Sequence, residues 1–431
     1  MERSDKVTTP QSPARPQRVT SLARIRSGAL VAVNIGAGPG LARRVGLKES
    51  NALYRAERRR LTLRVVLCLA ALAVLAFVSL GIMGAQGHYY VGGHEYGFYD
   101  PATVMRALWY HARNLVAEAT NWFAPDSSQW LTDNVEGYWA IPERAAVLGI
   151  TLICGVLLSV SGMLYQSVFR NPIAGPGLLG VSTGTSFGVM VLVLLYGSSA
   201  TAMVGERYLL CYGFGALILA TVLGIGRKMA GRGRSLDVVS LVLVGSIISQ
   251  LFGLVVSYVT LFVMDDGDYS IYFTISQMLV VDTSALSWIC LGVACAATII
   301  PVFLLRHHLG ALPFDEAEVR LWGLDYGRLR AVALVCGAIM ILAAQIHTGA
   351  VGLVSLIIPF LSRRWFGCSF AHQLAGNVCL GTLFLLICRD VADLIPFVGD
   401  GLAIGNVVGL VAVPLCLVVF ALQQGRMEDQ L

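Results

Sequence analysis

The stretch that decides the fold lies near residue 61, where the chain reads LTLRVVLCLAALAVLAFVSLGIM (Leu61–Met83). About twenty apolar residues in a helix cross a hydrocarbon core about 30 Å thick. Further apolar runs follow at about residues 145–165, 178–196, 208–226, 237–263, 286–305, 331–347, 350–362, 373–395 and 402–421. The sequence therefore predicts an all-α, polytopic membrane protein with ten transmembrane helices.

The composition agrees with a membrane protein. Of the 431 residues 56% are hydrophobic and 13% are charged, whereas a soluble domain carries about 25% charged residues. Residues 1–60 hold 13 Lys/Arg and 4 Asp/Glu, a net charge of +9, so the rest of the chain carries −4 of the total +5. We expect residues 1–60 to be a flexible basic tail, 61–422 to be the transmembrane domain, and 423–431 to be a second tail.

The distribution of positive charge predicts the orientation. With the N-terminus inside, the inner connections and tails hold 25 Lys/Arg, and the outer connections hold five. Positive residues remain on the cytoplasmic side, so both termini are expected in the cytoplasm of a multi-pass protein of the bacterial plasma membrane. The basic tail lacks interleaved aromatic residues and leads directly into a span, so lipid rather than nucleic acid is its expected partner.

The longest outer connection covers residues 85–143 and contains twelve aromatic residues. Asp100-Pro101 is a typical helix start, and apolar residues then recur at helical spacing from Val104 to Trp122. We expect an amphipathic helix there, lying at the outer membrane face.

The spans contain very few ionisable side chains, which usually mark proton or ion pathways. The exception is a group near the outer end of the ninth span, Arg389, Asp390 and Asp393. A secondary carrier would have only these three residues as its charge relay. The chain also lacks the Gly-x-x-x-x-Gly-Lys-Ser/Thr loop that holds ATP phosphates, so we expect its energy to come from another chain.

Small and polar residues mark two helices. Gly180, Gly184 and Gly188 recur at every fourth position, which lets helices approach closely. One face of the fifth span carries uncharged polar or small residues at Ser246, Gln250, Gly253, Ser257 and Thr260. This face is either a helix-packing surface or a translocation surface for a bulky polar ligand, and a dimer whose interface borders its pathway would satisfy both interpretations.

One motif is also compatible with an enzyme active site. Gly180-Val-Ser182-Thr-Gly184 matches the Gly-x-Ser-x-Gly pattern of serine hydrolases. His347 in another span is a conceivable base for Ser182. An intramembrane serine protease is therefore an alternative, although the strand-to-helix turn that this motif requires is not expected here.

The segment QSVFRNPIAGPGLLGVSTG (166–184) resembles a signature of the permeases of bacterial ATP-binding-cassette (ABC) importers, the FecCD/BtuC-like family. These type II importers carry iron-siderophore complexes, haem or vitamin B12. The signature residues are Gln166, Arg170, Asn171, Pro172, Ala174, Pro176, Gly180 and Gly184. Residues 315–323 and 349–363 resemble two further family segments, and the likeness extends over about residues 61–422.

The resemblance implies a permease dimer, formed with an identical or a different second subunit. It also implies two cytoplasmic ABC ATPase subunits and an extracytoplasmic binding protein that delivers the ligand. The chain itself would be a transporter subunit and not an enzyme, would bind no cofactor or metal, and would depend on ATP used by its partners. The resemblance assigns contact with the ATPase to the segment from Leu312 to Gly323, with Glu316, Glu318, Arg320 and Leu321 among its residues.

The chain departs from the family where the second span begins. Family members commonly have Arg-Leu-Pro-Arg there, whereas this chain has Ile141-Pro-Glu-Arg144. Arg144 and Arg389 are therefore the arginines expected to dock the binding protein. The expected ligand is an iron-siderophore complex, and haem and vitamin B12 are the alternatives.

Overall fold

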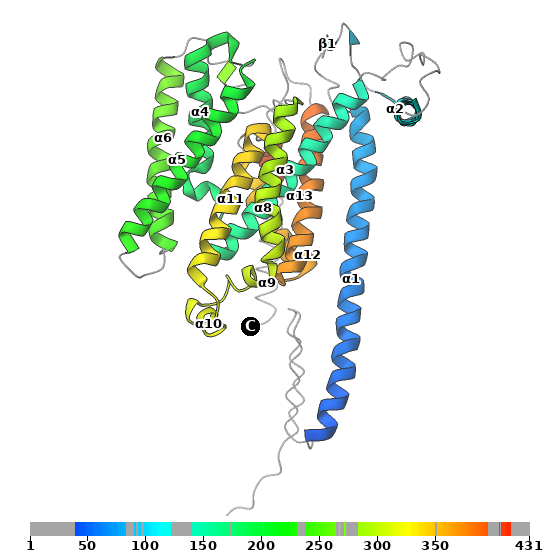
Figure 1. Ribbon diagram of the computed structural model, residues 1–431, viewed down its shortest axis with the longest axis vertical. Coiled ribbons are helices and arrows are strands. Elements are labelled where there is room, and N and C mark those ends of the chain that lie inside the picture. The colour runs from blue at the N-terminus through cyan, green and yellow to red at the C-terminus, as the bar shows by residue number, and fades with distance from the viewer. Residues whose placement is uncertain are drawn as a thin grey trace, which may run out of the picture. The chain divides into compact units, whose positions relative to one another are not determined.

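A computed structural model (Figure 1) describes residues 39–82, 90–91, 94–95, 99–121, 140–172, 174–200, 202–230, 238–263, 267, 271–272, 283–349, 351–394, 405 and 407–414. The chain divides into two compact units, Met1–Asn51 and Ala52–Leu431. The two expected tails lie outside the described residues, except that residues 39–60 form the first part of helix α1 (Pro39–Ile82). The features below belong to the second unit.

Within the part of the chain that the structure describes, seven helices are long and apolar enough to cross a membrane. They coincide with seven of the expected spans and are α1, α3 (Ala140–Phe169), α5 (Val204–Ala230), α6 (Val238–Phe262), α8 (Ala285–Leu304), α11 (Tyr326–Thr348) and α13 (Phe370–Leu394). The other three expected spans contain shorter helical segments, namely α4 (Val181–Tyr196), α12 (Gly352–Phe366) and residues 407–414. The helical membrane fold is confirmed, and the count of ten spans stays a prediction.

The centre of the bundle is formed by α3, α11, α12 and α13 (Figure 1). In its most apolar window α11 is 78% buried, and α3 and α13 are each 67% buried. By contrast, α1 is 17% buried and α6 is 22% buried. The central helices are held by protein contacts, whereas α1 and α6 leave most of their apolar surface to the bilayer or to partners.

Glycines set the closest helix contacts. A Cβ atom on Gly155 of α3 would lie 2.6 Å from the carbonyl oxygen of Gly381 on α13. A Cβ atom on Gly184 of α4 would lie 2.7 Å from the Cα atom of Gly215 on α5. These approaches confirm that the glycine stripe of the third span packs helices together, because any side chain there would meet backbone atoms.

A small separate core closes the C-terminal end of α1. Leu80 of α1, Val104 and Ala107 of α2 (Pro101–Asn121), and Ile141 of α3 are buried together. α2 is the amphipathic helix predicted from the sequence, although Trp122 lies outside the described residues. Hydrogen bonding from Thr103 caps its start and holds the pKa of the Asp100 carboxyl below its usual range. Nearby, β1 (Tyr90–Val91) pairs antiparallel with β2 (His94–Glu95).

Candidate functional site

The signature segment forms the turn between α3 and α4. Arg170 ends α3 with φ of 50°, the one left-handed non-glycine residue among those described. After it, the backbone N–H of Ala174 donates to the Asn171 carbonyl at 3.1 Å, and a short helix, η1 (Pro176–Leu179), follows. Gly180 then starts α4 with φ of 73°, a conformation that favours glycine. The signature residues thus encode one specific turn.

Gln166 fixes the end of α3 against α12. Its side chain is 1% exposed, and its Nε2 donates to the Leu356 carbonyl at 2.9 Å. Its Oε1 accepts a hydrogen bond from the Arg363 guanidinium. Both polar ends of the amide are therefore used, which makes Gln166 a tie between the two helices rather than a ligand-binding residue.

Arg170 joins this turn to the segment between α8 and α11. Its Nη1 atom lies 3.0 Å from Asp315 Oδ1, and its Nη2 atom donates to the Tyr326 hydroxyl at 3.1 Å. Hydrogen bonding from Arg170 holds the pKa of the Asp315 carboxyl below its usual range. Partial burial opposes the charge on Arg170, but the bonds to Tyr326 and Asp315 outweigh it and raise the arginine pKa. We call Arg170, Asp315 and Tyr326 the arginine junction.

The segment that follows α8 contains two short helices, α9 (Arg306–Leu309) and α10 (Glu316–Leu321). Leu312 and Val319 are fully buried and anchor it to the bundle. Glu316 and Arg320 form an ion pair of 2.6 Å one turn apart, and Gly323 ends the segment with φ of 77°. The expected coupling segment is therefore ordered, with its charged residues on a short surface helix.

Its apolar residues divide between the core and the surface. Leu321 is 86% exposed, Trp322 is 54% exposed, and Phe314 packs edge-on against Trp322 with the ring centroids 5.2 Å apart. We call Phe314, Leu321 and Trp322 the coupling patch. Sequence reasoning missed Phe314 and the roles of Asp315 and Tyr326. The apolar residue directly before the Asp315 helix cap was the available signal for Phe314.

The polar face of α6 is largely uncovered. Gln250 and Ser257 are exposed, Gly253 has open space where a side chain would be, and Ser246 donates to the Leu243 carbonyl at 3.0 Å. Thr260 is buried and donates to the Val256 carbonyl at 2.9 Å. Four of the five predicted residues thus line one accessible, uncharged surface, and the fifth, Thr260, is buried.

The two expected docking arginines are buried. Arg144 is 6% exposed and donates to the carbonyls of Leu80 and Gly81 at 2.9 and 3.2 Å, closing the end of α1. Arg389 is 8% exposed and bonds Asp393 and Thr151. Their guanidinium groups make contacts inside the chain, and the docking role expected for both stays a prediction.

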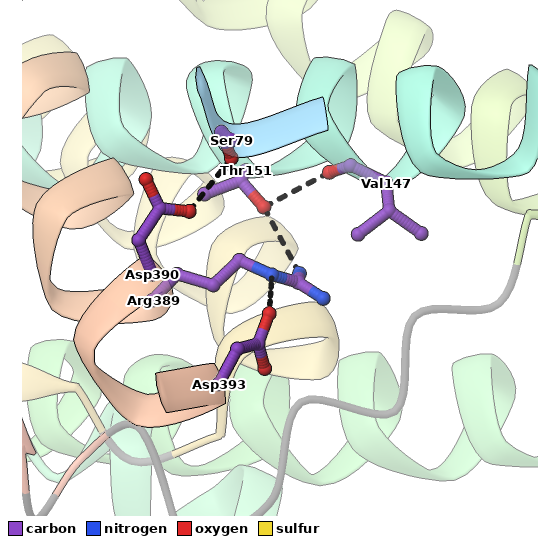
Figure 2. Close-up of polar contacts among 6 residues, drawn as sticks. All are labelled: Ser79, Val147, Thr151, Arg389, Asp390 and Asp393. Atoms are coloured by element: carbon purple, nitrogen blue, oxygen red, sulfur yellow. Dashed lines mark hydrogen bonds and ion pairs between the residues drawn. The ribbon is translucent and has the colours of Figure 1, made fainter. Parts of the chain in front are cut away.

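Figure 2 shows how the intramembrane charges are arranged. Asp390 of α13 accepts a hydrogen bond of 2.6 Å from Ser79 of α1, and Arg389 lies 3.4 Å from Asp393 and 3.3 Å from Thr151 of α3. The three ionisable residues predicted from the sequence thus bridge α1, α3 and α13. Arg389 and Asp390 each make a contact to another helix, and Asp393 pairs with Arg389 on its own helix, which favours a structural role over an ion relay.

The geometry does not assemble a serine protease. Ser182 accepts a hydrogen bond of 2.8 Å from Gln345, and His347 Nε2 lies 3.3 Å from the Tyr208 hydroxyl. A nucleophile and its base must lie within hydrogen-bonding reach of each other. Here the serine and the histidine face different partners.

Comparison with known proteins decides the family. A model of the FecCD transport family matches residues 118–421, well over half of the chain. This chain belongs to the FecCD transport family. It is a membrane-embedded permease of an ABC transporter, and members of this family are not themselves enzymes.

The relatives of this FecCD permease transport different ligands. A probable iron chelatin transport system permease protein of Helicobacter pylori is 29% identical over 57% of this chain and 72% of its own length. The vitamin B12 import system permease protein BtuC of Salmonella paratyphi A is 30% identical over 68% of this chain and 86% of its own length. The fold matches a metal-chelate type ABC transporter solved in an inward-facing conformation, with a TM-score of 0.61, 21% identity, and coverage of 85% of this chain and 99% of the other.

Proposed function

We propose that this permease imports an iron chelate of the siderophore type. It would receive the ligand from an extracytoplasmic binding protein and be driven by two separate cytoplasmic ATPase subunits. The name of the Helicobacter pylori relative supports the ligand class. The scarcity of ionisable residues in the spans supports an external source of energy.

The arginine junction is the observation that carries this proposal. A partner that moves α10 would pull on Asp315, and Asp315 is joined through Arg170 to the ends of α3 and α4. Tyr326, the first residue of α11, shares the same guanidinium. Because α3 and α11 are among the three most buried of the spanning helices, a displacement at the surface would reach the centre of the bundle.

The coupling patch supplies the surface for that partner. Large apolar side chains exposed next to one another on a polar loop indicate an interaction site. Leu321 and Trp322 face outward, while Val319 of the same helix is buried. ATP binding would close the ATPase dimer on this patch and switch the permease between outward-open and inward-open states, to which the ATPase binds differently.

The exposed polar face of α6 fits a second permease chain, identical or different, with the ligand passing between the two. Ser246, Gln250 and Ser257 offer hydrogen bonds without charge. Such a surface suits siderophores, haem and corrinoids alike, so haem and vitamin B12 remain the alternative ligands. Uptake assays with each labelled compound in cells that lack other importers distinguish them.

The coupling patch can be tested with a matched pair of variants. Leu321→Asn should reduce the amount of ATPase that copurifies with the permease and the uptake that ATP supports. Met229→Asn is the control, because Met229 is also exposed but belongs to the end of α5 and not to this segment. Equal ATPase retention in the two variants would remove the patch from the proposal.

A secondary carrier is the competing function. It predicts that uptake stops when the proton gradient is collapsed while ATP remains, whereas the proposed importer continues.

The proposed orientation is tested separately with reporter fusions at residues 1 and 431. Signals from the periplasmic side at either terminus would contradict the positive-inside assignment.

A further inference from the structure

An apolar groove lies where α1, α3, α8 and α13 meet. Its volume is about 580 Å³, within the range of about 300–1,000 Å³ that holds ligand-sized molecules. Val65 of α1, Val160 of α3, Phe303 of α8, and Ala375 and Val378 of α13 line it, with one charged residue, Arg306. The coupling patch and the polar face of α6 do not contribute to it.

The groove extends from one end of the bundle toward its middle. Arg306 is the first residue of α9, two positions after the end of α8, and the groove residues of α13 extend from Ala371, beside the helix start, to Cys379. Eight residues of helix correspond to about 12 Å, close to half of a hydrocarbon core about 30 Å thick. The groove therefore has the reach of an acyl chain in one leaflet, which is the cytoplasmic leaflet in the orientation proposed above.

Among the residues that the structure describes, the charged end of the groove has no acidic partner. The guanidinium of Arg306 lies over the Phe303 ring, 4.4 Å from its centroid, and donates to the Phe303 carbonyl at 3.0 Å. Within the described part of the chain Arg306 forms no ion pair with a carboxylate. Arg64, next to Val65 in the sequence, likewise bonds a neutral group, the carbonyl of Trp365. Among the described residues, neither arginine is paired with a carboxylate.

We propose that this groove binds an anionic phospholipid. The acyl chain would fill the apolar cleft, and the phosphate would meet Arg306. Basic sites between transmembrane helices on the cytoplasmic side are typical sites for such head groups. The lipid would also explain how α1 is retained beside the bundle, since only 17% of its apolar window is buried by protein.

The test measures lipid bound to the purified chain. Wild type and variants are equilibrated in micelles containing equal amounts of phosphatidylglycerol and phosphatidylcholine, and the retained lipids are quantified by mass spectrometry. We expect wild type to retain phosphatidylglycerol with about a fivefold preference, the effect of one arginine near an anionic head group. Arg306→Gln should remove the preference, and Ala375→Phe should reduce retention of both lipids.

Two controls keep the result specific. Arg328→Gln removes an exposed charge that does not line the groove, and Ala297→Phe adds the same ring to α8 at an exposed position outside it. Both should behave as wild type. Val378→Trp fills the groove from another position if Ala375→Phe fails to fold.

Three outcomes would overturn the proposal. One is equal retention of the two lipids by wild type, and another is an unchanged preference in Arg306→Gln. The third is loss of a copurifying protein chain, instead of lipid, when the groove is filled. These readouts need neither ATP nor a transported ligand, so a failure here is distinguishable from a failure of the proposed import function.

Discussion

Replacing Gly184 by alanine is expected to destabilise the contact between α4 and α5. The added Cβ atom would lie 2.7 Å from the Cα atom of Gly215 and 3.0 Å from the carbonyl oxygen of Phe214. Both are backbone atoms, so a change of side-chain rotamer cannot relieve the clash and the helices must separate. Gly213→Ala on α5 is the matched control, because nothing lies within 4 Å of its added Cβ atom.

The size of the expected change in the free energy of unfolding follows from comparing the two variants. Alanine should stabilise either helix by about 0.5–1 kcal/mol, because glycine loses more conformational freedom on folding. Only Gly184→Ala also introduces overpacking, which costs about 1–3 kcal/mol. The backbone gain is common to both, so their free energies of unfolding should differ by about 1–3 kcal/mol.

The assay is reversible unfolding in mixed micelles with increasing denaturing detergent, followed by tryptophan fluorescence. The account expects Gly184→Ala to unfold at a lower detergent fraction than wild type, and Gly213→Ala at an equal or higher one. If the two variants unfold together, α4 and α5 do not pack through this glycine stripe.

Three further predictions address other parts of the chain. The pKa of Asp315 is lowered, so its ion pair with Arg170 should persist above about pH 4, the unfolded value, and be lost as pH falls through the folded pKa. The pH profile of ATP-driven uptake should therefore show no titration assignable to Asp315 between pH 5 and 8. A step in that range that Asp315→Asn removes would contradict this. Ser79→Ala removes the 2.6 Å bond to buried Asp390 and should lower the free energy of unfolding by about 1.5–3 kcal/mol, whereas Thr62→Ala, at an exposed hydroxyl, should change it little. Ser182→Ala should retain transport, and complete loss of activity in a folded variant would revive the protease interpretation.

The membrane fold could be predicted because its signals are local. Runs of about twenty apolar residues define spans on their own, and Asp100-Pro101 with the apolar spacing after it predicted helix α2. The burial ranking of the helices could not be predicted from these signals. Both α1 and α11 read as apolar spans, and only the three-dimensional arrangement shows that α11 is central and α1 peripheral.

The sequence could predict which segments form the functional site, but not how their residues contact one another. The signature and the segment 312–323 were identified separately, while the bond that joins them, between Arg170 and Asp315, links residues 145 positions apart. The burial of Arg144 and Arg389 could not be predicted, because a sequence does not show that an arginine at the end of a span is covered by another helix.

The most direct test of the account is a double-mutant cycle on the arginine junction. Arg170→Gln, Asp315→Asn and the double variant are reconstituted with the ATPase, and transport of labelled ferric siderophore per ATP hydrolysed is measured. Asp325→Asn breaks an exposed 2.9 Å ion pair with Arg328 at the same end of the bundle and serves as the control. The account predicts that each single variant loses coupling, that the double variant falls no further, and that the control is unchanged. Wild-type coupling in both single variants would contradict the claim that this junction carries motion from the ATPase to the bundle.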